Sequence, residues 1–536
     1  MAERLMGIET EYAVSALYPG RGAFETNELV NRLMGRARMK LAHLPDNGGG
    51  LYLANGARFY IDYGDHPELT TPECTNPWDI VRYILAGERL LGGLADDLTR
   101  ALGIEVMLFK SNVDYGSRWV TWGCHESYMH RAAPSVLSDQ IIPHLATRII
   151  YTGAGGFNSH SSGLEFTLSP RVPHLAGVVS NNSTSDRGIF HTKDESLTRP
   201  GFHRLHILCG ESLCSETAMW LKVGTTALVV AMAEAGLRPG AVVGLRSPLQ
   251  AMQTIASDPS CSAVVETTGG RCLSALEIQC HYLAQAESHL GDASMPPWAE
   301  EVCRKWRETL NLLLDAPESA DEMLDWGIKR ALYASYAKGR GVEWEWLDGW
   351  NRLMAEVRGA LDDVGAPDCP LTADMVQDNL GSAHPAVCRL KAFLEENGFS
   401  WGELDALFRL RQELLEIDMR FGQLGGRGIF DGLDRAGVLS HHVSGVESID
   451  EAVMEPPASG RARIRGEAIR RLASNNGNYR CDWQGILELG TNRVLDLSEP
   501  FEAAERWLEY EQAVSAEPTA FAALLTPLDG APIRRF

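Results

Sequence analysis

The chain has 536 residues, a hydrophobic content of 45% and a net charge of −22 at pH 7. This length predicts two or three domains, and the apolar content is enough to bury a large core. This net charge argues against nonspecific nucleic-acid binding, in which lysine and arginine neutralise phosphates, so we expect no nucleic-acid partner. We also expect a cytoplasmic protein without a membrane partner. No apolar run approaches the roughly 20 residues that span a bilayer, and the N-terminus does not resemble a secretory signal.

The predicted elements are mixed along the chain. Residues 1 to about 210 are expected to form mainly strands and loops, with one helix over about 76–101. Apolar residues spaced by three and four predict further helices over about 215–236, 273–291 and 296–340. This order predicts an α+β catalytic domain over 1–420, in which about 350–410 is a helical insertion. A Gly-rich break at 422–428 is expected to precede a small C-terminal domain, so that the second domain covers 421–536.

The cysteines indicate a reducing environment. There are eleven of them, an odd number, and they are scattered along the chain without a C-x-x-C pair. This pattern is typical of free thiols in a cytosolic protein and indicates neither a disulfide framework nor a zinc site.

Two short segments near the start place polar groups at every second residue. On a strand such residues share one face, so Glu9 and Glu11 are expected together, as are Arg58, Tyr60 and Asp62. Carboxylates, a phenol and a guanidinium suit a Mg²⁺ ion that carries phosphate oxygens. Ordinary half-exposed strands alternate in the same way, and from the alternation alone this second interpretation stays open.

A run of five arginines within residues 461–471 departs from the acidic balance of the chain. It predicts a local positive patch that could hold a phosphate, a carboxylate or an acidic partner. A solvated helix face is the alternative. The chain has no phosphate loop of the G-x-x-x-x-G-K-[ST] type and no complete dinucleotide fingerprint. Any nucleotide is therefore expected on the polar strands.

Six short motifs occur in one order along the chain. They are residues 6–12; 55–58 with Asp62 and 66–68; 123–126; 204–206; 221–225; and 465–467. In this order they resemble the Pup ligase and Pup deamidase family, which attaches or removes the small protein modifier Pup in bacteria. The resemblance runs through residues 6–345 and again through about 415–485, whereas about 350–410 has no recognised counterpart.

The resemblance implies a fold like that of glutamine synthetase and the carboxylate-amine ligases, with ATP on a curved antiparallel sheet. By motif position it implies that Asp62 is the catalytic base. It further implies Mg²⁺ ligands at Glu9, Tyr60 and Glu68, and ATP contacts at Arg58, Thr71 and Trp483. The residues expected to support the site or to contact the modifier are Glu11, Glu73, Arg204, Arg461, Arg463 and Arg465.

The resemblance implies ATP and Mg²⁺ as cofactors, a small acidic Pup-like modifier as partner, and lysine-bearing target proteins. Three features favour the ligase branch over the deamidase branch, and one of them is the turn at 72–76, which resembles the ligase version. Only residues 13–54 separate the first two polar segments, and three residues separate Asp62 from the His-Pro-Glu motif at 66–68. We therefore expect a ligase that phosphorylates the modifier's C-terminal glutamate and joins it to lysines. A deamidase or depupylase of the same fold is the alternative.

Overall fold

A central sheet organises the computed structural model. The structure describes residues 4–512, apart from 19–21, 24, 118, 181–185, 192–199, 368–369 and 503. Over these residues nine strands form one sheet, in which every neighbouring pair is antiparallel except β12 and β13. From edge to edge the strands are β12 (Gly177–Ser180), β13 (Gly188–His191), β14 (His203–Ile207), β9 (Cys124–His130), β1 (Met6–Glu11), β7 (His66–Thr70), β6 (Arg58–Asp62), β5 (Leu51–Leu53) and β4 (His43–Pro45). The predicted α+β class with a largely antiparallel sheet is confirmed.

Smaller sheets flank this one. A three-stranded sheet has the order β3-β2-β8, and a four-stranded sheet near the C-terminus has the order β17-β18-β19-β20. Two hairpin-like pairs, β10-β11 and β15-β16, complete the described strands. Their bounds are β2 (Ala13–Tyr18), β3 (Gly22–Ala23), β8 (Val106–Phe109), β10 (Gly156–Phe157), β11 (Phe166–Thr167), β15 (Val264–Glu266), β16 (Cys272–Ser274), β17 (Tyr479–Cys481), β18 (Gly485–Glu488), β19 (Arg493–Asp496) and β20 (Trp507–Glu509).

One face of the central sheet is covered by two long helices, α2 (Pro77–Leu102) and α5 (Glu216–Glu234). Ile8 and Cys124 of the sheet meet Ile84 of α2 and Met219 of α5 around one small cavity. The helix α2 begins where the Asn76 side chain accepts a hydrogen bond from the Asp79 backbone N–H, with proline at the first helical position. Both helices bury most of their apolar residues in the same core as the sheet. We call this covered side the back face.

The helix predictions were partly right. The expected helix over 76–101 is α2, and the expected helix over 215–236 is α5. The expected stretch over 296–340 contains two helices separated by Pro317, which has no N–H for an α-helical bond. The expectation of a single helix before residue 210 was wrong, because α1, α3 and α4 also lie there. The other helices up to residue 340 are α1 (Thr26–Lys40), α3 (Pro134–Thr147), α4 (Ile149–Thr152), η1 (Val172–His174), α6 (Pro248–Ala256), α7 (Ala275–Ser288), α8 (Ala299–Asp315), η2 (Pro317–Glu322) and α9 (Asp325–Gly339).

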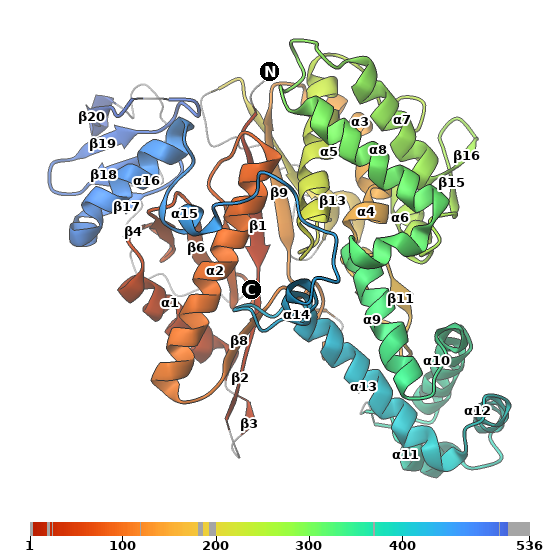
Figure 1. The fold of residues 1–536 in the computed structure, drawn as a ribbon. Helices are drawn as coiled ribbons and strands as arrows, with labels where there is room; N and C mark the ends of the chain where they lie inside the picture. The colour runs from red at the N-terminus through yellow and green to blue at the C-terminus, as the bar shows by residue number, and fades with distance from the viewer. Residues whose placement is uncertain are drawn as a thin grey trace.

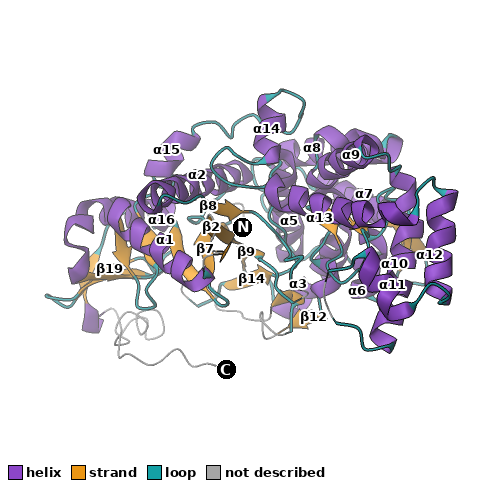
Figure 2. Cartoon of the chain, turned by 90° about the horizontal axis from the view of Figure 1, so that it is seen from below, coloured by secondary structure: helices purple, strands orange, loops and turns teal. Residues whose placement is uncertain are grey.

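The segment predicted as a helical insertion is helical. Its helices bury a core of their own, centred on Trp350, Val357, Leu390 and Leu414, which also takes in Tyr333 of α9. Figures 1 and 2 show it at the opposite end of the molecule from the C-terminal sheet. That it is an insertion stays a prediction. Its elements are η3 (Trp344–Trp346), α10 (Leu347–Asp363), α11 (Ala373–Leu380), α12 (Pro385–Glu396), η4 (Trp401–Glu403) and α13 (Leu404–Phe421).

The Gly-rich run at 422–428 packs tightly against α2. A Cβ atom at Gly92 would lie 2.9 Å from the backbone nitrogen of Gly425, so this close approach needs glycine. Beyond it, Ile464 and Ile486 pack on Leu44 and Tyr52 of β4 and β5. The division of the chain into 1–420 and 421–536 stays a prediction, and residues 513–536 lie outside the described residues. The helices here are α14 (Ile429–Arg435), α15 (Ile449–Met454), α16 (Gly460–Leu472) and η5 (Ala473–Asn478). Within the described residues, every helix is too short or too polar to cross a bilayer.

Candidate active site

The face of the central sheet opposite α2 and α5 carries the predicted site; we call it the front face. Across β1, β7 and β6, Glu9 lies opposite Thr70, which lies opposite Arg58. One row further, Glu11 lies opposite Glu68, which lies opposite Tyr60. Directly opposed residues on neighbouring strands share a face, so both rows line one wall. The two polar segments seen in the sequence therefore form a single surface.

Three carboxylates of this wall converge. One oxygen from each of Glu11, Asp62 and Glu68 lies within 4.8 Å of the others. Burial together with the charges of Glu9, Glu11 and Asp62 raises the pKa of Glu68 well above its ordinary value. Burial and the neighbouring Glu11 likewise raise the pKa of Asp62. A divalent cation among these oxygens would favour their charged forms, and hard oxygen donors of this kind fit Mg²⁺.

Tyr60 stands beside these acids on the same wall. Burial and the charges of Glu9 and Glu68 raise its pKa well above the ordinary value, so the phenol stays protonated. Its hydrogen bond with Glu68 lowers the pKa of that carboxyl, but burial and the neighbouring acids raise the same pKa by more. Tyr60 therefore offers a neutral oxygen next to the carboxylates.

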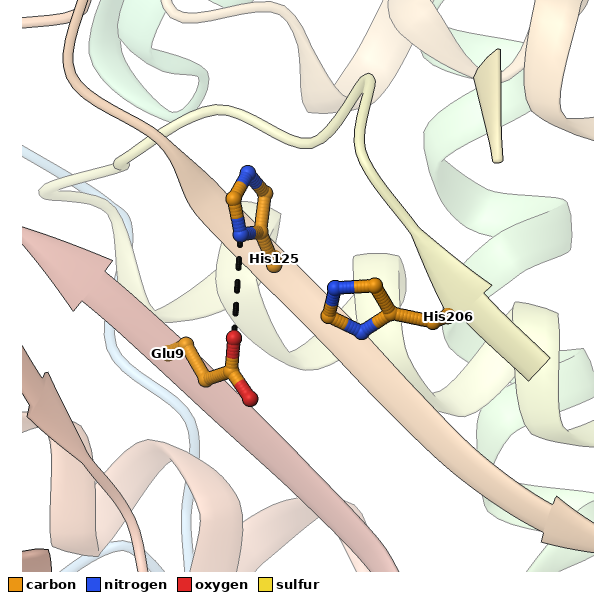
Figure 3. Close-up of side chains that lie close together, drawn as sticks. All are labelled: Glu9, His125 and His206. Atoms are coloured by element: carbon orange, nitrogen blue, oxygen red, sulfur yellow. Dashed lines mark ion pairs between the residues drawn. The ribbon is translucent and has the colours of Figure 1, made fainter. Parts of the chain in front are cut away.

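Glu9 has two histidine neighbours. Its Oε2 lies 3.7 Å from Nδ1 of His125, and the two groups and His206 point toward one another from β1, β9 and β14 (Figure 3). Burial opposes ionisation of Glu9, but the His125 hydrogen bond and the charges of His206, His125 and Arg204 lower its pKa to about 2. Burial also lowers the pKa of His206 to about 3, so this imidazole is neutral at pH 7. Glu9 therefore stays ionised within the wall.

Sequence reasoning did not select His125 or His206 as site residues. A signal existed in the spacing. His125 and Ser127 are two residues apart, as are Arg204 and His206, and polar residues two apart on a strand share one face. What placed them beside Glu9 was the strand order β14-β9-β1, which the sequence did not reveal.

Glu11 has partners of its own. Its Oε2 lies 2.9 Å from His66 Nδ1 and accepts a hydrogen bond of 2.7 Å from the Gly123 backbone N–H. Burial acts to raise its pKa, but the His66 hydrogen bond and the charges of His125 and His66 lower it. This arrangement is compatible with the supporting part predicted for Glu11. In contrast, Asp62 is exposed at the end of β6.

The predicted ATP contacts lie along one side of the wall. Thr71 and Trp483 line a cavity together with Glu9 and Arg204. The Thr71 hydroxyl accepts a hydrogen bond of 3.1 Å from the Ile8 backbone N–H.

Arg58 is fixed beside this side of the wall. Its guanidinium lies 4.1 Å from the centre of the Tyr60 ring, and its Nε donates to Asp46 Oδ2 at 3.0 Å. Asp46 was missed by sequence reasoning, because it lies outside the alternating segments.

A second cavity, of about 600 Å³, opens at the other side of the same strands. Asp62, Glu11 and His66 line it, together with Arg171 and Arg187. Glu9 and Trp483 line the first cavity, and Asp62 lines the second. The wall thus separates two compartments.

The run of arginines is not the free positive patch that the sequence predicted. Arg465 is fully buried, and Arg461 is nearly so; both pair with Glu73, with Arg461 Nε 2.6 Å from Glu73 Oε1. Burial opposes ionisation of Glu73, but the two arginines lower its pKa to about 2. Arg463 pairs instead with Glu467 at 3.0 Å on the side of α16. The prediction of one positive patch was wrong because two of its members tie α16 to Glu73, in the segment that follows β7.

Comparisons with known proteins identify the family of the chain. A family model described as Pup-ligase protein matches residues 4–349 and 390–487. A Pup–protein ligase of Rhodococcus erythropolis strain PR4 is 30% identical over 521 residues, which is 95% of this chain and 99% of that protein.

Two solved structures share the fold. The complex between prokaryotic ubiquitin-like protein Pup and its ligase PafA has a TM-score of 0.71 at 24% identity, covering 96% of this chain and 92% of that one. The Pup ligase PafA in complex with ADP has a TM-score of 0.65 at 24% identity, with 92% and 94% covered.

Proposed function

Because the chain belongs to the Pup-ligase family, we propose that it is an ATP-dependent ligase that joins the C-terminal glutamate of a Pup-like modifier to lysines of target proteins. The observation that carries the proposal is the single front-face wall on which Glu9, Tyr60, Asp62 and Glu68 lie. The names of the curated relatives and the ADP of a structurally similar ligase support it.

In this proposal the wall would hold a magnesium nucleotide. Glu9, Tyr60 and Glu68 would hold Mg²⁺, which when bound supplies positive charge to the phosphate oxygens. Thr71 and Trp483 would contact the nucleotide from the first cavity. Arg58 would offset negative charge on the phosphates, since Asp46 and the Tyr60 ring hold its guanidinium in place.

In the first step the γ-carboxylate of the modifier's C-terminal glutamate attacks the γ-phosphorus of ATP. The products are an acyl phosphate and ADP. Little covalent chemistry falls to the protein in such a step, so its residues act by positioning and by charge. Arg204, which lines the first cavity beside Glu9, would hold a carboxylate or phosphate oxygen there.

In the second step a target lysine replaces the phosphate. The lysine ammonium has an ordinary pKa of about 10.4 and must lose a proton before its nitrogen can attack the acyl carbon. Asp62 would take that proton, because its carboxylate is exposed at the end of β6 and lines the second cavity, where a lysine amine can reach it. The nitrogen then bonds to the acyl carbon, and phosphate leaves.

The test counts nucleotide against product. With a purified Pup-like modifier that ends in glutamate, a ligase forms one ADP for each conjugate. The alternative deamidase would release ammonia only from a modifier that ends in glutamine. A depupylase would release the lysine-bearing protein from a finished conjugate. In both cases ADP would not accumulate in proportion. The structure favours the ligase on one observation: residues 13–54 hold β2, β3, α1, β4 and β5, which leaves little room for a long extra loop there.

The location proposed for this activity is the cytoplasm. The cysteines within the described residues are all free thiols, as in a reducing compartment.

A further inference from the structure

Two aromatic side chains stand exposed on the wall of the cavity that holds Asp62. Tyr63 is 68% exposed and Trp119 is 77% exposed, and both line the 600 Å³ cavity. Among the large hydrophobic side chains that the described residues leave exposed, only these two are aromatic. Their concentration at one opening points to binding.

Tyr63 is held by a tight turn. It follows Asp62 directly, and residues 63–65 close the hairpin in which Asp62 pairs with His66. Gly64 and Asp65 adopt φ values of 87° and 61°, and Asp65 Oδ1 accepts a hydrogen bond of 2.9 Å from Asn27. The turn therefore keeps the ring of Tyr63 next to the proposed base.

Trp119 lies at the tip of a braced loop. The loop's two sides are joined by hydrogen bonds from Asp114 N–H to the Val120 carbonyl, 3.0 Å, and from Trp122 N–H to the Asn112 carbonyl, 3.1 Å. The Tyr115 hydroxyl donates to Asp418 of α13 at 2.7 Å and anchors the loop to the helical segment. The base of the loop is therefore fixed, and Trp119 at its tip lines the cavity with its ring 6.0 Å from that of His160.

The cavity wall suits a lysine side chain. An ammonium is attracted to the face of an indole or phenol ring, and a four-carbon stem can lie along aromatic surface. Glu11, Asp62 and Asp114 on the same wall are complementary to the ammonium charge. Arg171 and Arg187 also line the cavity, and they suit the phosphate that leaves the acyl carbon.

We propose that Tyr63 and Trp119 form the opening through which the target lysine reaches Asp62, with the lysine stem between the two rings and its amine at the carboxylate. This inference rests on the proposed ligase function. It assigns the second cavity to the target lysine and leaves the nucleotide to the first. Tyr63 and Trp119 are thus specificity residues, which act on the acceptor before the chemistry.

The test compares two acceptors in the same mixture of enzyme, modifier and ATP. One acceptor is a lysine-bearing protein. The other is hydroxylamine, which traps an acyl phosphate as a hydroxamate and has neither a cationic charge at neutral pH nor a methylene stem. Trp119→Ala and Tyr63→Ala should each raise the KM for the lysine acceptor about five-fold or more. The rate of hydroxamate formation and the KM for ATP should stay within about two-fold of wild type.

Two further variants sharpen the result. Trp119→Phe keeps an aromatic face and should restore most of the affinity for lysine. Met39→Ala removes a side chain that is 75% exposed on α1, away from this cavity, and should change neither acceptor.

The proposal is overturned if the alanine variants keep the wild-type KM for lysine, or if they lose lysine and hydroxylamine activity equally. In the second case the aromatic residues support the acyl phosphate or the fold. If the wild-type enzyme forms no hydroxamate, the proposed ligase function itself is contradicted. If the alanine variants form hydroxamate normally and keep the wild-type KM for lysine, only the part proposed for Tyr63 and Trp119 is contradicted.

Discussion

Buried carboxylates lie on both faces of the central sheet, and their surroundings differ. On the back face, Glu126 of β9 is paired with Arg148, whose Nη1 lies 2.9 Å from its Oε2. Burial opposes ionisation there, but the charges of Arg148 and Lys222 lower the pKa of Glu126. On the front face, Glu68 lies among other acids, and burial and those acids raise its pKa. Glu126 on the back face has its own cationic partner, whereas Glu68 on the front face has acidic neighbours, whose repulsion a divalent cation would offset.

Because of this difference, we expect the two faces of the strand β9 to contribute to different properties, the back face to stability and the front face to function. His125 and Glu126 are neighbours in β9, yet one faces Glu9 and the other faces Arg148. A substitution on the back face should therefore change the free energy of unfolding. A conservative substitution on the front face should change catalysis or cation binding.

The largest effect is expected from Asp62→Asn on the front face. The amide cannot take a proton from the lysine ammonium, so conjugate formation should fall by about 10²–10⁴-fold. Binding of nucleotide should change little, since the variant keeps the proposed Mg²⁺ ligands Glu9, Tyr60 and Glu68 and Asp62 lines the other cavity. Rates of conjugation and the affinity for ADP, measured side by side, check this. A wild-type conjugation rate would rule out Asp62 as the base.

Glu126→Gln tests the back face. It leaves the buried Arg148 without its carboxylate and should lower the free energy of unfolding by about 3–5 kcal/mol. Denaturant titration measures this loss. Replacing both partners, as Glu126→Gln with Arg148→Met, should recover part of it. A single variant as stable as wild type would show that the pair contributes little to the fold.

Acid should weaken the attachment of α16 through Glu73. The folded pKa of Glu73, about 2, lies below its ordinary value of 4.5. Its ionised form therefore stabilises the fold above pH 4.5, and this contribution is lost as the pH falls from 4.5 toward 2. Glu73→Gln should remove that part of the pH dependence of unfolding. Glu467→Gln, at the half-exposed partner of Arg463, is the control and should leave it in place.

The smallest effect is expected at the exposed His442. Its Nδ1 lies 3.0 Å from Glu216 and its Nε2 lies 3.0 Å from Asp434. Partial burial opposes protonation, but these carboxylates raise the pKa of His442 above its ordinary value of 6.5. The stabilisation is thus complete below pH 6.5 and is lost as the pH rises through the folded pKa. Solvent limits it to about 0.2–1 kcal/mol. His442→Gln should flatten the unfolding free energy over this range, and an unchanged slope would contradict the assignment.

Several features of the front face could be predicted from the sequence, because they are local. The alternation of Glu9 with Glu11, and of Arg58 with Tyr60 and Asp62, marks one strand face in each segment. The helix α1 could also have been predicted, since its buried residues recur at three and four, as in Leu29, Val30, Leu33, Met34 and Ala37. It was overlooked in favour of strands.

Other features depend on contacts between distant segments. Asp46 fixes Arg58 through a pairing that no periodicity indicates, and His206 reaches Glu9 through two intervening strand contacts. The charge of Arg465 suggested an exposed patch. Arg465 is instead buried in an ion pair with Glu73, which is almost 400 positions away in the chain. A run of charge in sequence does not reveal which charges the fold will pair.

The central claim is that the front-face acids are arranged for a divalent cation. The direct test is the free energy of unfolding of wild type and Glu68→Gln, each with and without Mg²⁺. At a Mg²⁺ concentration 100 times its Kd, wild type should gain about 2.7 kcal/mol. Without Mg²⁺, Glu68→Gln should be at least as stable as wild type, because the amide relieves repulsion, and Mg²⁺ should no longer stabilise it. A wild type indifferent to Mg²⁺, together with a Glu68→Gln variant that is destabilised without it, would contradict the claim.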